Sequence, residues 1–142
     1  MKTQENSELH TFFVAQLEDV YDAEQQLIEA LPDMAEAATS SELRMAFENH
    51  LEETKMHALR LEKAFELMGE SPSSKECKAM SGLVEEGEEV IEDTEEGTLV
   101  RDCGLIVAAQ KTEHYEIASY GSLRTLAEIL GYSEVAHLLQ AN

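Results

Sequence analysis

Apolar residues recur at helical spacings along most of the chain. In the first segment the apolar residues recur at spacings of three, four and seven and so share one helical face; they are Phe13, Leu17, Val20, Leu27 and Leu31. This stripe predicts a first helix over 8–38, preceded by a flexible tail at 1–7. Alternation of period two, which would indicate a strand, does not organise the segment.

Capping signals divide the next part of the chain. Thr39 and Glu42 have the spacing of a capping box, so a second helix is expected to start there. Gly69, and Pro72 three residues later, predict the end of this helix. Ser73 and Glu76 repeat the capping spacing and predict a shorter, very acidic helix. The brief turn between the first two helices makes them an antiparallel hairpin.

Thr98 and Gly131 bracket another long helical segment, and Ser133 is expected to cap a final helix over 134–142. Five apolar residues predict the inner side of the long helix. These are Val100, Cys103, Ile106, Ile117 and Leu126.

The order of elements is a hairpin, a long connection with an accessory helix, and a second hairpin. The fold class is therefore all-α, and a four-helix bundle with one long crossover has the ferritin-like topology. The length of 142 residues suits a single domain over 1–142. The last helix is short for such a bundle, so we expect a fourth helix that is truncated.

A net charge of −20 is the strongest global feature. It excludes direct binding to nucleic acid, because phosphates would be repelled, while attraction of cations and simple surface solvation both remain open. No apolar run is long enough to cross a membrane and the start lacks the apolar core of a signal peptide, so we expect a cytoplasmic protein. Cys77 and Cys103 lack metal-site spacing and are expected to be free thiols.

Two glutamates interrupt apolar stripes. Glu24 lies between Val20 and Leu27 in the first helix, and Glu113 lies on the predicted inner side of the long helix after Thr98. A carboxylate in an apolar core is costly unless it is paired or binds a cation. One such residue is unremarkable, but two on helices that open different hairpins favour a shared cation.

The second helix supplies nitrogen and oxygen donors on one face, because His50, Glu53 and His57 follow at spacings of three and four. Glu116 shares the side of Glu113. Four residues after Glu116, Tyr120 could donate a hydrogen bond to a ligand carboxylate. Carboxylates and imidazoles suit two iron or manganese ions in a bundle core. A hydrogen-bonded network without metal is the alternative.

Three segments resemble the YciE/YciF family of ferritin-like stress proteins. They are 21–27 (YDAEQQL), 50–54 (HLEET) and 110–121 (QKTEHYEIASYG), and shorter matches extend the likeness over nearly the whole chain from Glu8. The resemblance implies a ferritin-like bundle, a homodimer, a two-metal site and a role in stress response. It matches Glu24, Glu53 and Glu113 with inward glutamates of the family.

Family members continue the fourth helix with further ligands, so a metal site in the chain as far as Asn142 is expected to be incomplete. Two functions follow from these patterns. The first is a di-iron or di-manganese oxidoreductase, a peroxidase, catalase-like enzyme or ferroxidase, with Glu24, His50, Glu53, His57, Glu113 and Glu116 as metal ligands and Tyr120 orienting them. The second is a non-enzymatic stress-induced structural or interaction protein with a weak or vestigial site.

Overall fold

A computed structural model describes residues 2–142, and over this range the chain forms five helices and no strand. The all-α prediction is therefore confirmed. The helices are α1 (Lys2–Ala37), α2 (Ser41–Leu67), α3 (Lys78–Asp93), α4 (Leu99–Leu130) and α5 (Ser133–Ala141). None of the helices in residues 2–142 combines the length and apolar composition that crossing a membrane requires.

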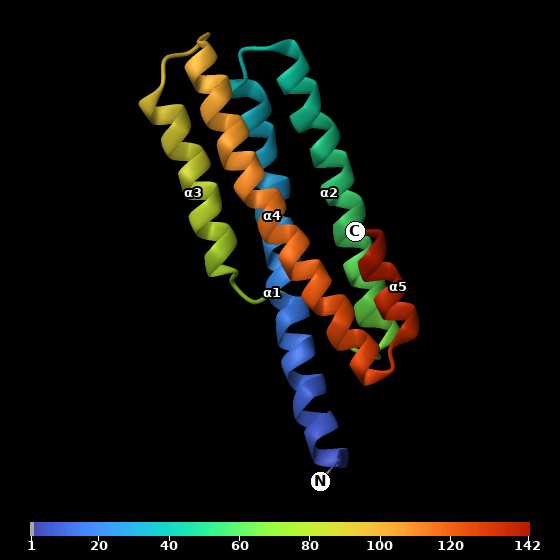
Figure 1. Cartoon of the computed structure of the whole chain (residues 1–142). Coiled ribbons are helices and arrows are strands. Elements are labelled where there is room, and N and C mark those ends of the chain that lie inside the picture. The colour runs from blue at the N-terminus through green and yellow to red at the C-terminus, as the bar shows by residue number, and fades with distance from the viewer. Residues whose placement is uncertain (1) are drawn as a thin grey trace.

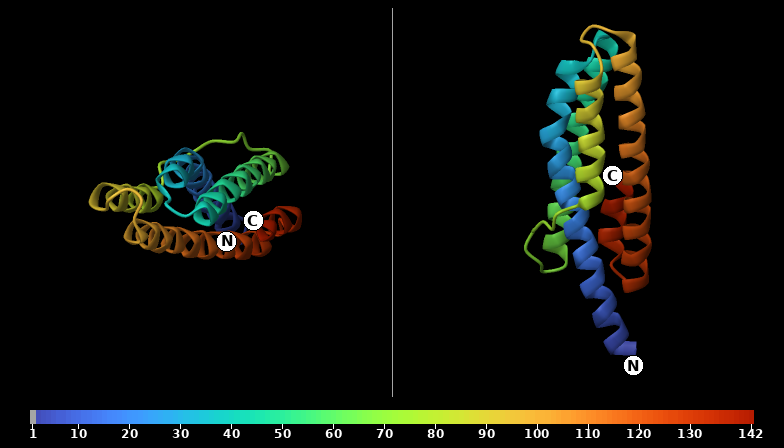
Figure 2. Two further views of the ribbon diagram at one scale, coloured as in Figure 1. Left: turned by 90° about the horizontal axis from the view of Figure 1, so that it is seen from above. Right: turned by 90° about the vertical axis from the view of Figure 1, so that its left-hand side faces the viewer.

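Two antiparallel hairpins, α1–α2 and α4–α5, form the bundle (Figure 1). In the described range α1 packs against α2 and α4, and α5 packs against the same two helices, whereas α2 and α4 have no extensive contact with each other. The crossover carries α3 along the outside of α1 and α4 (Figure 2). Because α5 is short, it fills only part of the space between α2 and α4 (Figure 1).

The first helix begins earlier than predicted. α1 starts at Lys2, so residues 2–7 are helical where a flexible tail was expected, whereas Met1 lies outside the described residues. The helix also runs through Pro32 and ends at Ala37, one residue before the predicted end. Tertiary packing therefore overrides the loss of one backbone hydrogen bond at the proline.

The predicted start and end of α4 are confirmed. The Thr98 side chain accepts a hydrogen bond from the backbone N–H of Arg101, and Gly131 closes α4 in the left-handed conformation with φ = +80°. Three other predicted caps are wrong. Ser40, not Thr39, caps α2, because the N–H of Thr39 donates to Asp102 at 2.7 Å.

Cys77, not Ser73, caps α3. Its Sγ accepts from the N–H of Met80, and its own N–H donates to Asp22 Oδ2 at 2.7 Å. At the start of the final helix, Tyr132 occupies the cap position of α5 without a side-chain hydrogen bond, and the predicted cap Ser133 is the first helical residue.

The predicted inner side of the long helix is also wrong. Val100, Cys103, Ile106 and Ile117 are exposed, with 68% exposure at both Val100 and Ile117. The opposite face of α4 is buried instead, and its main residues are Leu105, Ala108, Thr112, Glu116, Tyr120, Leu123 and Ala127. Apolar residues lie around much of α4, so their periodicity alone does not select the inward face.

The core consists of two apolar clusters along the bundle. One contains Leu17 of α1 and Leu123 of α4, and the other contains Leu27 of α1 and Leu105 of α4. Glu24 lies on the buried stripe of α1 where these clusters meet. The fold therefore places a polar layer between two apolar layers.

Candidate metal centre

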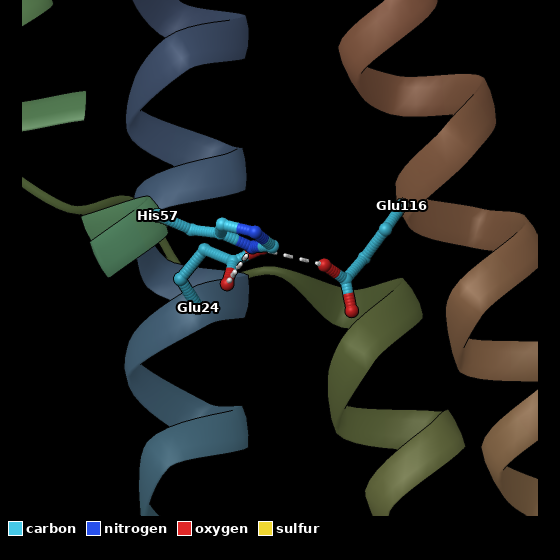
Figure 3. A group of neighbouring side chains, drawn as sticks. All are labelled: Glu24, His57 and Glu116. Carbon is cyan, nitrogen blue, oxygen red and sulfur yellow. Dashed lines mark ion pairs between the residues drawn. The ribbon is translucent and has the colours of Figure 1, made fainter. Parts of the chain in front are cut away.

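Side chains from three helices meet in this polar layer. Glu24 comes from α1, His57 from α2 and Glu116 from α4 (Figure 3). Nδ1 of His57 lies 3.6 Å from Oε2 of Glu24 and 3.7 Å from Oε2 of Glu116. One ligand atom from each residue lies within 4.8 Å of the other two, so the three can converge on one ion.

The donors of this group are buried but not satisfied. Glu24 is fully buried and Glu116 is 8% exposed. Among the described residues, Oε2 of Glu24, Nδ1 of His57 and Oε1 of Glu116 have no hydrogen-bond partner. A buried carboxylate without a hydrogen-bond partner costs several kcal/mol, so three such ligand atoms in one place form a group that could hold a cation.

The spacing of the donors agrees with that interpretation. Nitrogen and oxygen ligands lie about 2.0–2.2 Å from a transition-metal ion, which places neighbouring ligand atoms about 3.0–3.5 Å apart. The separations of 3.6 and 3.7 Å around His57 are slightly longer than this. They exceed hydrogen-bond distance, and small side-chain movements would bring the ligand atoms to the spacing found around an ion.

The pKa values of Glu24 and His57 reflect their burial and their closeness to each other and to Glu116. Burial raises the pKa of Glu24 to about 7, and the charge of Glu116 adds to the rise while His57 opposes it. Burial alone would lower the pKa of His57, but the carboxylates of Glu116 and Glu24 outweigh it and raise that pKa to about 9. Protons therefore partly balance the carboxylates when no metal is bound.

Tyr120 supports the cluster from α4. Its hydroxyl donates to Oε1 of Glu24 at 3.2 Å, as the sequence predicted for a ligand carboxylate. Burial, followed by the charges of Glu24 and Glu116, raises the pKa of Tyr120, so the phenol keeps its proton at neutral pH. The bond fixes one oxygen of Glu24 and leaves the other free.

A cavity of about 410 Å³ opens beside the cluster. Glu53 and Glu113 line it and are exposed, while His50 is half-buried with Nε2 3.9 Å from Oε1 of Glu116. The other lining residues are His57, Glu116, Ile117, Tyr120, Gly121, Arg124, Leu139, Gln140 and Asn142. All six predicted ligands thus lie in or next to one region, but only Glu24, His57 and Glu116 form a close group.

The inward position expected for Glu113 is wrong, and Glu116 takes it. The buried stripe of α4 passes through Thr112 and Glu116, which are four residues apart, so Glu113 lies about 100° from Thr112, toward the cavity. No sequence signal identified Asn142 as a neighbour of the site, whereas Arg60 was expected near the histidines of the second helix. Asn142 accepts from Arg60 at 2.9 Å and donates to the backbone oxygen of His57 at 3.2 Å.

Comparison with known proteins agrees with this architecture. Residues 8–142 match the model of a family described as a domain of unknown function, DUF892. The chain belongs to the DUF892 family. This DUF892 protein is 50% identical over 129 residues to protein YciF of Escherichia coli strain K12, in a match that covers 90% of this chain and 77% of YciF.

Two solved structures share its fold. The E. coli stress protein YciF superposes with a TM-score of 0.89 at 48% identity, covering 94% of this chain and 84% of YciF. YcfI of Rhodopseudomonas palustris gives a TM-score of 0.90 at 38% identity, covering 94% and 85% of the respective chains. The resemblance inferred from the sequence and the ferritin-like fold are both confirmed.

Proposed function

We propose that this DUF892 protein binds iron or manganese between α1, α2 and α4 and uses it to process peroxide, dioxygen or ferrous iron under stress. The observation that carries the proposal is the set of three buried donors without hydrogen-bond partners at Glu24, His57 and Glu116. The naming of the similar YciF as a stress protein supports the physiological setting.

The six candidate metal ligands divide into the close group and the residues that line the cavity. Glu24, His57 and Glu116 would hold a first ion, since two carboxylates and an imidazole suit iron or manganese. His50, Glu53 and Glu113 line the adjoining cavity and would contribute to a second ion. A bound pair of such ions supplies reversible electron transfer toward peroxide or dioxygen.

The chain itself positions and shields this chemistry. Tyr120 orients Glu24 through its hydrogen bond, and its raised pKa keeps the hydroxyl proton that this bond needs. The apolar clusters on either side of the polar layer exclude water from the buried face of Glu24. The cavity would give small substrates access to the other side of the close group, where the exposed carboxylates of Glu53 and Glu113 line it.

A non-enzymatic structural or interaction protein is the second candidate. It is favoured by the positions of Glu53 and Glu113, which are exposed, and of His50, because these three of the six predicted ligands lie outside the close group. The similar YcfI is described as a candidate structural protein, which supports the same view. Under this proposal the site is weak or vestigial.

Peroxide consumption by protein loaded with ferrous or manganous ions tests the first proposal. We expect metal-dependent consumption in the native chain, and its loss in His57→Gln, which removes the imidazole that contacts both carboxylates. Glu52→Gln, an exposed change on the same helix, is the matched control and should keep the activity. No activity in the native protein despite a metal-dependent rise in melting temperature would favour the second candidate.

A further inference from the structure

The apolar cluster that contains Leu27 and Leu105 borders a small cavity, which is separate from the cavity beside the metal centre. The small cavity has a volume of about 20 Å³ and lies where α1, α2, α3 and α4 come together. Leu27 lines it from α1, Phe47 from α2, Val84 from α3 and Ala108 from α4. One water molecule needs about 10–15 Å³ of such space, so the small cavity holds a single molecule of that size or slightly larger.

The lining of the small cavity is apolar at all but two positions. Among the described residues that line it, only His50 and Thr112 carry nitrogen or oxygen atoms in their side chains. The hydroxyl of Thr112 donates to the backbone oxygen of Ala108 at 3.2 Å, so its proton is already used. A buried water molecule typically makes about three hydrogen bonds, and the O–H groups of peroxide need partners in the same way. The small cavity therefore favours an apolar molecule over water or peroxide.

His50 joins the small cavity to the candidate metal centre. This side chain lines both the small cavity and the cavity of about 410 Å³ beside the close group. Its Nε2 lies 3.9 Å from Oε1 of Glu116. On α4, Thr112 lies one turn before Glu116, which is about 6 Å along the helix. The two cavities thus share the His50 side chain as a common wall.

Partly exposed side chains connect the small cavity with the surface. Met34 of α1 and Leu83 and Val84 of α3 line it, and all three are half-buried. Methionine is unbranched and has three rotatable bonds, so its side chain adapts readily to its surroundings. A small apolar molecule can therefore enter between α1 and α3 without disturbing the polar layer.

We propose that the small cavity binds dioxygen and is the route by which dioxygen passes His50 to the metal centre, a route that peroxide does not share. Dioxygen is apolar and only slightly larger than water, so it matches both the lining and the volume of about 20 Å³. Binding depends only on the side chains around the small cavity. Delivery to the ions rests on the function proposed above.

Nuclear magnetic resonance of methyl groups in the metal-free protein tests the binding step, because dioxygen is paramagnetic and speeds the relaxation of nearby protons. The protein is compared under dioxygen and under nitrogen. The gain in relaxation rate should be several-fold larger at Leu27 and Leu31, which line the small cavity, than at Leu17 and Leu123. The latter two are as deeply buried but belong to the other apolar cluster.

Three variants show whether this excess arises in the small cavity. Ala108→Val fills it and should remove the excess, whereas Val84→Ala enlarges it and should increase the excess. Ala118→Val, at an exposed position of the same helix, is the matched control and should behave like the native chain. Equal gains at all four leucines of the native protein, an excess that survives in folded Ala108→Val, or an excess that does not grow in Val84→Ala would each overturn the proposal.

Dioxygen consumption by the protein loaded with ferrous ions tests the delivery step. In Ala108→Val the dioxygen concentration that gives half the maximal rate should rise several-fold, while the maximal rate changes little. An unchanged half-saturating concentration would overturn the delivery step. Excess relaxation at Leu27 and Leu31 together with no dioxygen consumption by the loaded native protein would contradict the proposed function, and delivery with it, while supporting the binding step.

Discussion

Replacing Glu24 by Gln removes a charge that the metal-free core does not fully balance. Glu24 is completely buried, its Oε2 has no hydrogen-bond partner among the described residues, and burial raises its pKa from 4.5 to about 7. Gln has nearly the same shape and can still accept the hydrogen bond of Tyr120. The substitution therefore isolates the effect of the charge.

The raised pKa sets the size of the effect. Each pH unit corresponds to about 1.4 kcal/mol, so ionising Glu24 costs the folded state about 3 kcal/mol more than it costs the unfolded chain. The attraction of His57 is already included in this raised pKa. At pH 8 we expect metal-free Glu24→Gln to be about 1–3 kcal/mol more stable than the native protein, which raises its melting temperature by about 4–12 °C.

Thermal unfolding followed by circular dichroism, with and without manganous ion, measures this difference. Metal should raise the melting temperature of the native protein but have a much smaller effect on Glu24→Gln. Glu113→Gln serves as the control, because Glu113 is exposed and its loss should change metal-free stability by less than about 0.5 kcal/mol. A lower melting temperature for metal-free Glu24→Gln at pH 8 would refute the reasoning, since Glu24 would then be a satisfied member of a stabilising network.

Three further predictions follow from other contacts. The pKa values of Glu24 and His57 are both raised, so the folded state holds these protons more tightly than the unfolded chain does. Metal-free stability should therefore fall as pH rises from about 4.5 to 7, where Glu24 loses its proton, and from about 6.5 to 9, where His57 does. An increase of the urea midpoint over this range would contradict the prediction. Gly104→Ala should destabilise the fold by about 1–3 kcal/mol, because the new Cβ would lie 2.6 Å from Cγ1 of Val90, and adding Val90→Ala should recover part of the loss in urea unfolding. Asp102→Ala should cost about 1–3 kcal/mol in the same assay, since it leaves two backbone N–H donors at the start of α2 without their acceptor; an unchanged midpoint would argue against that role.

Local signals were enough to predict the helical fold. The cap at Thr98 and the left-handed end at Gly131 depend only on nearby residues, and both are confirmed. The stripe through Leu17 and Leu27 likewise placed Glu24 in the core of α1, where it is fully buried. These features could be predicted because each follows from chain geometry within a few turns.

The predictions that failed depend on contacts between distant segments. Cys77 becomes the cap of α3 because Asp22 of α1 fixes its backbone N–H, and Ser40 becomes the cap of α2 because Asp102 of α4 holds the residue before it. Neither hydrogen bond has a local sequence signal. The sequence offered several capping residues, and tertiary structure selected among them.

The face that α4 turns toward the core determines which of the predicted site residues are buried. The helix has two stripes, and the more apolar one through Val100 and Ile117 faces outward, while the buried one contains Thr112 and Glu116. The apolar pattern favoured the first stripe and therefore predicted that Glu113 lies inside the bundle. The inward stripe carries the polar side chains of the site, so apolar periodicity could not identify it.

Electron paramagnetic resonance of manganous ion tests the central claim most directly, because free Mn²⁺ gives a strong six-line spectrum that weakens when the ion binds. The account predicts that the native protein removes the signal of the first equivalent of Mn²⁺, and that Glu116→Gln, which alters a carboxylate of the close group, leaves most of it free. Glu113→Gln should retain the binding of that first ion. A native protein that leaves the first additions of Mn²⁺ free, or that binds them no better than Glu116→Gln, would contradict a metal centre at Glu24, His57 and Glu116.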